Sequence, residues 1–187
     1  MEQKERMDQG LIYDPADNRI STEQTSCLDA QYEFNATRPS EMKKRAVLLK
    51  QMLGAIGENC YIEPPFRANW GGKHVYMGNN VYANFNLTVV DDGNIYIGDN
   101  VMFGPNVTIA TANHPILPEL REKGLQYNKD VHIGKKCLDR SRRRDCSRYY
   151  NREQFRHWCR QCGCEGYSCK CCRCRKPVPC SAGNQPA

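Results

Sequence analysis

The chain has 187 residues, a formal net charge of +6 and 12 cysteines. Residues 138–187 hold 12 Lys and Arg against 4 Asp and Glu, while residues 1–137 are slightly acidic, so the positive charge belongs to the tail. No run reaches the roughly 18 apolar residues of a membrane span. The charged start MEQKERMDQG lacks the apolar core of a secretion signal. These features predict a cytoplasmic protein with no membrane partner.

Residues 1–57 are predicted to form a helical cap. Ser40 is a plausible N-cap for the segment EMKKRAVLLKQMLGAIG. Val47, Leu48 and Met52 follow a period near 3.6, which indicates one apolar helix face. The segment is therefore expected to pack that face on a core formed by the residues that follow.

A six-residue repeat begins at residue 75. Its units are VYMGNN, VYANFN, LTVVDD, IYIGDN, VMFGPN, VTIATA and, after an interruption, VHIGKK. Each unit begins with an aliphatic residue, and another apolar residue usually follows two places later. This period is typical of a parallel β-helix, in which three units form one coil and equivalent side chains stack inward. Ordinary alternating strands share the local pattern, but they do not need a fixed period of six.

The insertion at residues 111–130 interrupts the repeat, and such insertions are often binding or catalytic loops. It contains His114 beside a proline. On residue type alone, Asn84 and Asp92 are turn residues, and His74 and His132 are surface residues within repeat units.

Several stretches together resemble the maltose and galactoside O-acetyltransferases of the hexapeptide-repeat acyltransferase superfamily. They are YEFNATRPSE, GENCYIEPPF, VYANFNLTVVDD, IYIGDNVMFGPNVTI and NHP followed by ELR, within residues 3–137. The resemblance implies a mainly β fold, with a left-handed parallel β-helix over residues 58–137 behind the helical cap. It also implies a homotrimer with active sites between subunits, which transfers acetyl from acetyl-CoA to a hydroxyl of maltose, glucose or a galactoside.

The resemblance assigns roles to five residues. His114 would be the catalytic base, a role that suits a side chain whose pKa lies near neutrality. Asn84 and Asp92 match acceptor-binding positions, and Asp14 and Asn69 match less firmly. Acetyl-CoA would be a co-substrate, and no permanent cofactor or metal is implied.

The tail breaks the repeat. Continuing the phase of VHIGKK places Asp139, Asp145, Asn151 and His157 where inward apolar residues belong. Burying such groups unpaired costs several kcal/mol each, so the coil is predicted to end at residue 137. Codons for Asp, Asn and His can all arise from isoleucine codons shifted by one base. Residues 138–187 are therefore hypothesised to be a frameshifted reading, irregular or disordered, of the missing coils.

The family places most acetyl-CoA contacts in those missing coils, so the cofactor-binding residues are unknown and activity is predicted to be impaired. The alternative is a non-enzymatic protein that binds metal or nucleic acid through its Cys- and Arg-rich tail. The tail has two C-x₂-C pairs, but their spacing does not match a zinc module. Its basic residues and aromatics predict weak, salt-sensitive nucleic-acid binding rather than a specific partner.

Overall fold

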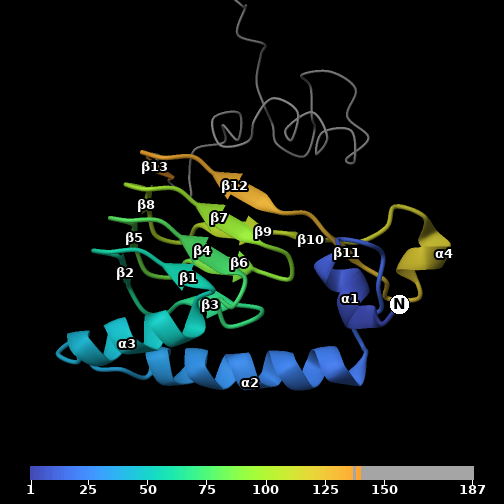
Figure 1. Ribbon diagram of the computed structural model, residues 1–187, viewed down its shortest axis with the longest axis horizontal. Helices are drawn as coiled ribbons and strands as arrows, with labels where there is room; N and C mark the ends of the chain where they lie inside the picture. The colour runs from blue at the N-terminus through green and yellow to red at the C-terminus, as the bar shows by residue number, and fades with distance from the viewer. Residues whose placement is uncertain (137, 140–187) are drawn as a thin grey trace, which may run out of the picture. The chain divides into compact units, whose positions relative to one another are not determined.

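The computed structural model describes residues 1–136 and 138–139. Three parallel sheets run along the repeat region and form the sides of a β-helix (Figure 1). The first sheet has the order β1-β4-β7-β12, the second β13-β8-β5-β2 and the third β3-β6-β9. Their strands are β1 (Ala55–Ile56), β2 (Tyr61–Ile62), β3 (Arg67–Ala68), β4 (Val75–Met77), β5 (Tyr82–Ala83), β6 (Thr88–Val90), β7 (Ile95–Ile97), β8 (Met102–Phe103), β9 (Thr108–Ala110), β12 (Val131–Ile133) and β13 (Leu138–Asp139).

The repeat determines which side chains fill the interior. The first and third residues of each six-residue unit are buried, and these residues belong to one continuous hydrophobic cluster. The intervening strand residues are half-buried or exposed, as the alternation of a strand requires. The predicted parallel β-helix is confirmed, and its inward positions are Val75, Met77, Val81, Ala83, Leu87, Val89, Ile95, Ile97, Val101, Phe103, Val107, Ile109, Val131 and Ile133.

One corner of the helix is held by a ladder of asparagines. Asn59, Asn80 and Asn100 all have positive φ, near 55°, a conformation that asparagine tolerates better than most residues. The Asn59 amide donates to the Asn80 oxygen at 3.2 Å, and the Asn80 amide donates to the Asn100 oxygen at 3.3 Å. The Lys136 N–H bonds the Asp99 carbonyl, which puts Lys136, with φ of 59°, at the equivalent position of the next coil.

Helices α1 (Gln3–Asp8), α2 (Asn18–Asn35) and α3 (Met42–Met52) precede the coils. In Figure 1, α2 and α3 lie beneath the first coil of the β-helix, where α3 contacts β1 and α2 contacts β3. The predicted N-cap at Ser40 is wrong: Glu41 occupies that position, without a side-chain cap bond.

The buried face of α3 also differs from the prediction. Val47 is 55% exposed, whereas Arg45 is 5% exposed. The Arg45 guanidinium donates to the Thr37 hydroxyl at 2.9 Å and to the Tyr61 hydroxyl at 2.6 Å. Because these acceptors satisfy the guanidinium, the helix can turn Arg45 inward together with Leu48, Leu49 and Met52.

The insertion forms an antiparallel hairpin, with a short helix between its two strands. These elements are β10 (Ala112–Asn113), α4 (Pro118–Arg121) and β11 (Tyr127–Asn128). Tyr13 joins the hairpin through backbone bonds to Gln126 in both directions. The N-terminal segment and the insertion therefore pack together on the same side of the coils (Figure 1).

The parallel pairing extends slightly beyond both predicted boundaries. It begins at Ala55 rather than residue 58, and Leu138 and Asp139 still pair with Met102 and Phe103 of β8. Backbone pairing uses only N–H and C=O groups, so it does not require the side-chain pattern to continue. The predictions for residues 140–187, including the frameshift and the tail-based alternative function, lie outside the described residues. Within the described part of the chain, no helix has the length and apolarity needed to cross a bilayer.

Candidate active site

His114 follows β10 and is exposed to solvent. Its Nδ1 lies 3.0 Å from the Leu125 carbonyl oxygen across the hairpin. A carbonyl can only accept a hydrogen bond, so this contact places a proton on Nδ1, and in the neutral imidazole Nε2 then carries the free lone pair. The hairpin thus presents His114 in the tautomer that a general base requires.

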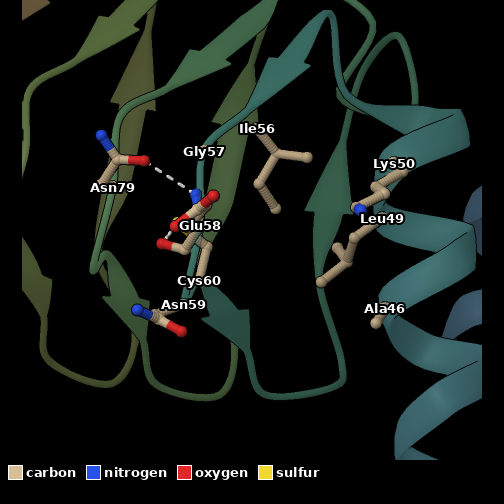
Figure 2. A pocket seen from close by; sticks show the side chains of 9 residues that line it. All are labelled: Ala46, Leu49, Lys50, Ile56, Gly57, Glu58, Asn59, Cys60 and Asn79. Carbon is tan, nitrogen blue, oxygen red and sulfur yellow. Dashed lines mark hydrogen bonds between the residues drawn. The ribbon is translucent and has the colours of Figure 1, made fainter.

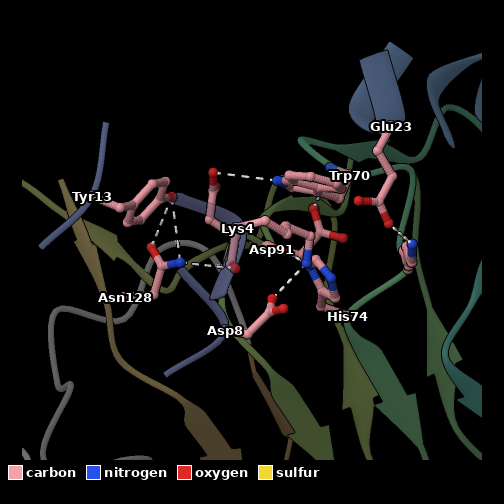
Figure 3. A network of polar contacts seen from close by, with 10 residues as sticks. Lys4, Asp8, Tyr13, Glu23, Trp70, His74, Asp91 and Asn128 are labelled. Carbon is pink, nitrogen blue, oxygen red and sulfur yellow. Dashed lines mark hydrogen bonds and ion pairs between the residues drawn. The ribbon is translucent and has the colours of Figure 1, made fainter. Parts of the chain in front are cut away.

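Asp91 and Asp92 follow β6 at a corner of the β-helix, and both are buried. The Asp91 carboxylate accepts the backbone N–H groups of Trp70 at 2.7 Å and Gly72 at 3.0 Å. Its backbone oxygen lies 2.6 Å from Nδ1 of His74. Asp91 therefore holds the Trp70–Gly72 turn of the coil below in place, and Figure 3 shows Trp70, His74 and Asp91 grouped together.

Burial raises the pKa of Asp91, although the Trp70 N–H opposes this effect. The folded protein therefore binds a proton at Asp91 more readily than the unfolded chain does. Between the ordinary aspartate pKa and the raised one, the folded state holds more protons, so the free energy of unfolding falls as pH rises.

We expect Asp91→Asn to remove the contribution of Asp91 to the pH dependence of the free energy of unfolding. The variant is destabilised at every pH, because its amide NH₂ cannot accept the Gly72 N–H. The deficit relative to the wild type should narrow as pH rises above the ordinary aspartate pKa. Urea unfolding of both proteins over a pH series measures this difference. A deficit that stays constant or widens with pH would contradict the raised pKa.

The five predicted site residues fall into separate places. Asn69 and Asp92 meet directly, with the Asn69 amide donating to Asp92 Oδ2 at 2.8 Å. Asp14 lies in the segment after α1, where its side chain accepts the Ala16 N–H at 2.9 Å. Asn84 precedes β6, whereas Asp92 follows it. The side-chain oxygen of Asn84 accepts the Phe85 N–H at 2.8 Å. The fold thus joins Asn69 to Asp92 and puts Asn84 at another corner.

Sequence reasoning missed two residues beside Asp92. Gln126 Nε2 donates to Asp92 Oδ1 at 3.2 Å, and Asn128 Nδ2 donates to the Asp92 carbonyl at 2.9 Å. Both side chains also contact the Tyr13 hydroxyl, and burial raises the pKa of Tyr13. His74, predicted to be a surface residue rather than a ligand, is half-buried, with its ring centroid 5.1 Å from that of Trp70. His132 is exposed and stacks on Tyr96.

Two pockets lie near these elements. A pocket of about 240 Å³ is bordered by α1, the Asp92 corner and the end of the hairpin, with His74, Asp92 and Asn128 among its lining residues. A larger pocket of about 450 Å³ lies between α3 and the first coil, where Leu49 and Ile56 face Glu58 and Asn79 (Figure 2). None of the five predicted site residues lines the larger pocket, so size alone does not identify the active site.

Comparison with known proteins identifies the family. The maltose acetyltransferase hexapeptide capping motif matches residues 6–57. Galactoside O-acetyltransferase of Lactococcus lactis subsp. lactis is 50% identical over 133 residues, which cover 71% of this chain and 64% of that protein. The Escherichia coli galactoside O-acetyltransferase is 48% identical over 103 residues, 55% of this chain and 50% of the relative. The chain thus spans less than two thirds of these two relatives.

More complete matches come from other relatives and from solved structures. Nodulation protein L of Rhizobium meliloti is 35% identical over 133 residues, 71% of this chain and 72% of that protein. A galactoside acetyltransferase in complex with coenzyme A aligns with a TM-score of 0.65, 35% identity and 74% coverage of both chains. A maltose O-acetyltransferase from Clostridium difficile 630 aligns with a TM-score of 0.67 and 35% identity, over 74% of this chain and 76% of that one. The chain therefore belongs to the maltose and galactoside O-acetyltransferase family of hexapeptide-repeat acyltransferases.

Proposed function

We propose that the chain descends from an acetyl-CoA-dependent sugar O-acetyltransferase and uses His114 as its general base. The observation that carries the proposal is the 3.0 Å contact between His114 Nδ1 and the Leu125 carbonyl, which leaves Nε2 available. The family relationship, and the coenzyme A bound to one structural neighbour, support the donor. Maltose, glucose and galactosides are the proposed acceptors.

The proposed reaction begins when His114 Nε2 takes the proton of an acceptor hydroxyl. The hydroxyl oxygen attacks the thioester carbonyl carbon, and a tetrahedral oxyanion forms. Its collapse breaks the carbon–sulfur bond and expels the CoA thiolate, which takes the proton from the imidazolium. The products are the acetylated sugar and free CoA, and His114 returns to its starting tautomer.

Asp14, Asn69 and Asn84 are proposed to bind acceptor hydroxyls. Asn69 is exposed and the other two are half-buried, so a bound sugar can reach their polar atoms. Once the sugar covers them, a missing or misplaced hydroxyl leaves a donor or acceptor unpaired, which discriminates between sugars. Asn84 and Asp92 lie beyond opposite ends of β6. An active site completed by Asn84 of a neighbouring subunit would suit this separation, so we propose the left-handed helix and homotrimer of the family. Asp92, which the resemblance also assigns to acceptor binding, is instead proposed to have a structural role within the single chain. Both of its carboxylate oxygens already accept hydrogen bonds from protein side chains.

We expect the chain to transfer acetyl groups poorly, because residues 138–187 carry none of the hexapeptides that hold acetyl-CoA in the family. The test compares the full chain with a version whose reading frame is restored after residue 137. Release of CoA is followed with acetyl-CoA and maltose, glucose or a galactoside, and the acetyl sugar is identified by mass.

Each result of this comparison has a distinct meaning. Turnover by the restored protein together with weak turnover by the full chain supports both parts of the proposal. Equal turnover by the two proteins would contradict the impairment. Failure of the restored protein to acetylate any of these sugars would contradict the proposed activity.

A further inference from the structure

A buried polar network joins three distant parts of the chain beside the candidate active site. Tyr13 comes from the segment after α1, Asp92 from the corner after β6, and Gln126 from the residue before β11. The Gln126 amide nitrogen donates to both the Tyr13 hydroxyl and Asp92 Oδ1. Gln126 is 9% exposed and Asp92 is 7% exposed. Figure 3 shows Tyr13 and Asn128 side by side within this network.

The Asp92 carboxylate is committed to protein groups on both oxygens. Oδ2 accepts from the Asn69 amide at 2.8 Å, and Oδ1 accepts from Gln126 at 3.2 Å and more weakly from the Trp70 ring nitrogen at 3.4 Å. A buried carboxylate needs such donors, because its desolvation is otherwise costly. Asp92 is therefore an anchor to which the hairpin is attached.

Gln126 lies next to the residue that orients His114. The carbonyl that faces His114 Nδ1 belongs to Leu125, and the Gln126 backbone pairs with Tyr13. The path from the anchor to the base is short: Gln126 donates to Asp92, Leu125 is its neighbour in the chain, and the Leu125 carbonyl contacts the imidazole.

From this geometry we infer that Gln126 is a positioning residue for His114. By bridging Asp92 and Tyr13, it fixes the Leu125 carbonyl and so selects the Nδ1-protonated tautomer with Nε2 facing outward. This inference rests on the proposed function for its effect on catalysis, but the effect on the tautomer is independent of any activity.

The first test measures the tautomer of His114 in the full chain by ¹⁵N NMR of the imidazole nitrogens. The wild type should show a dominant Nδ1-protonated form at a pH where the ring is neutral. Gln126→Met keeps the side-chain length but removes the hydrogen bonds, and it should give a mixture of tautomers. The His132 signals report whether the fold is preserved, and Gln51→Glu, at an exposed position on α3, is the control.

The second test measures kcat as a function of pH in the frame-restored protein and in its Gln126 variants. Gln126→Glu places a second carboxyl group where the amide lies 3.2 Å from Asp92. Two anions at this distance repel, whereas a shared proton restores the hydrogen bond at lower pH. The ratio of variant to wild-type kcat should therefore rise as pH falls, while Gln126→Met should stay about 10²-fold below the wild type at every pH, with KM for acetyl-CoA unchanged.

The outcomes separate this inference from the proposed function. A tautomer mixture in Gln126→Met supports positioning, even if no protein turns over and the proposed function fails. A wild-type tautomer in Gln126→Met, in a protein whose His132 signals are unchanged, would overturn the inference. Tyr13→Phe removes only the hydroxyl that faces Gln126, and it should shift the tautomer in the same direction to a smaller extent.

Discussion

Replacement of His114 by alanine is expected to lower kcat for acetyl transfer by about 10²- to 10⁴-fold, the usual contribution of a general base. The side chain is exposed and its Nδ1 contacts only the hairpin backbone at Leu125 among the described hydrogen bonds, so its removal leaves the core intact. The loss is measured as CoA release at saturating acetyl-CoA in the frame-restored protein. Its expected higher activity lets a large decrease in kcat be measured.

His132→Ala is the matched control, because this exposed histidine stacks on Tyr96 outside the candidate site. It should leave kcat within about twofold, since an exposed residue away from the reacting groups has little effect on stability or geometry. Equal losses in the two variants, or no loss in His114→Ala, would show that His114 is not the base.

Trp70→Ala is expected to cause the largest loss of stability, about 3–5 kcal/mol in the free energy of unfolding. The Trp70 side chain has no exposed surface, packs beside the His74 ring, and has the Lys4 ammonium 5.6 Å from its ring centroid. Its loss opens a cavity between α1 and the Asp91–Asp92 corner and leaves Asp92 without the ring N–H.

Urea unfolding followed by circular dichroism measures the effect of Trp70→Ala. Tyr32→Ala is the control for loss of an aromatic ring, because Tyr32 is 76% exposed on α2. It should change the unfolding free energy by less than about 0.5 kcal/mol. A Trp70→Ala variant as stable as Tyr32→Ala would mean that the cap and the coils do not depend on this contact.

The coils could be predicted from the sequence because their period is local. In a unit such as VYMGNN, the apolar first and third residues, Val75 and Met77, identify the inward positions, and the Gly-Asn-Asn sequence identifies the turn. The following units show the same pattern. The buried face of α3 was less predictable. Val47 fits the apolar pattern but is exposed, while Arg45 is buried because Thr37 and Tyr61 supply acceptors from elsewhere in the chain.

The network around Asp92 could not be predicted from the sequence. Gln126 is 113 positions from Tyr13 and 34 from Asp92, and no local pattern links such residues. Glutamine in an inserted loop is ordinarily a solvated surface residue. Its burial is a product of the fold, which brings the cap and the insertion together at one corner. The family resemblance suggested His114 and Asp92, but not the residue that connects them.

The side-chain amides of the asparagine ladder all point in one direction along the β-helix, from earlier coils to later ones. Asn59 donates to Asn80 and Asn80 donates to Asn100, so every amide is oriented the same way. Reversing the Asn80 amide would set donor against donor at Asn59 and acceptor against acceptor at Asn100, so the orientation of one amide fixes that of its neighbours. Lys136 offers no amide oxygen at the equivalent position. In the described coils, the ladder of amide hydrogen bonds therefore runs from Asn59 to Asn100 and ends there, because the equivalent residue of the next coil is Lys136.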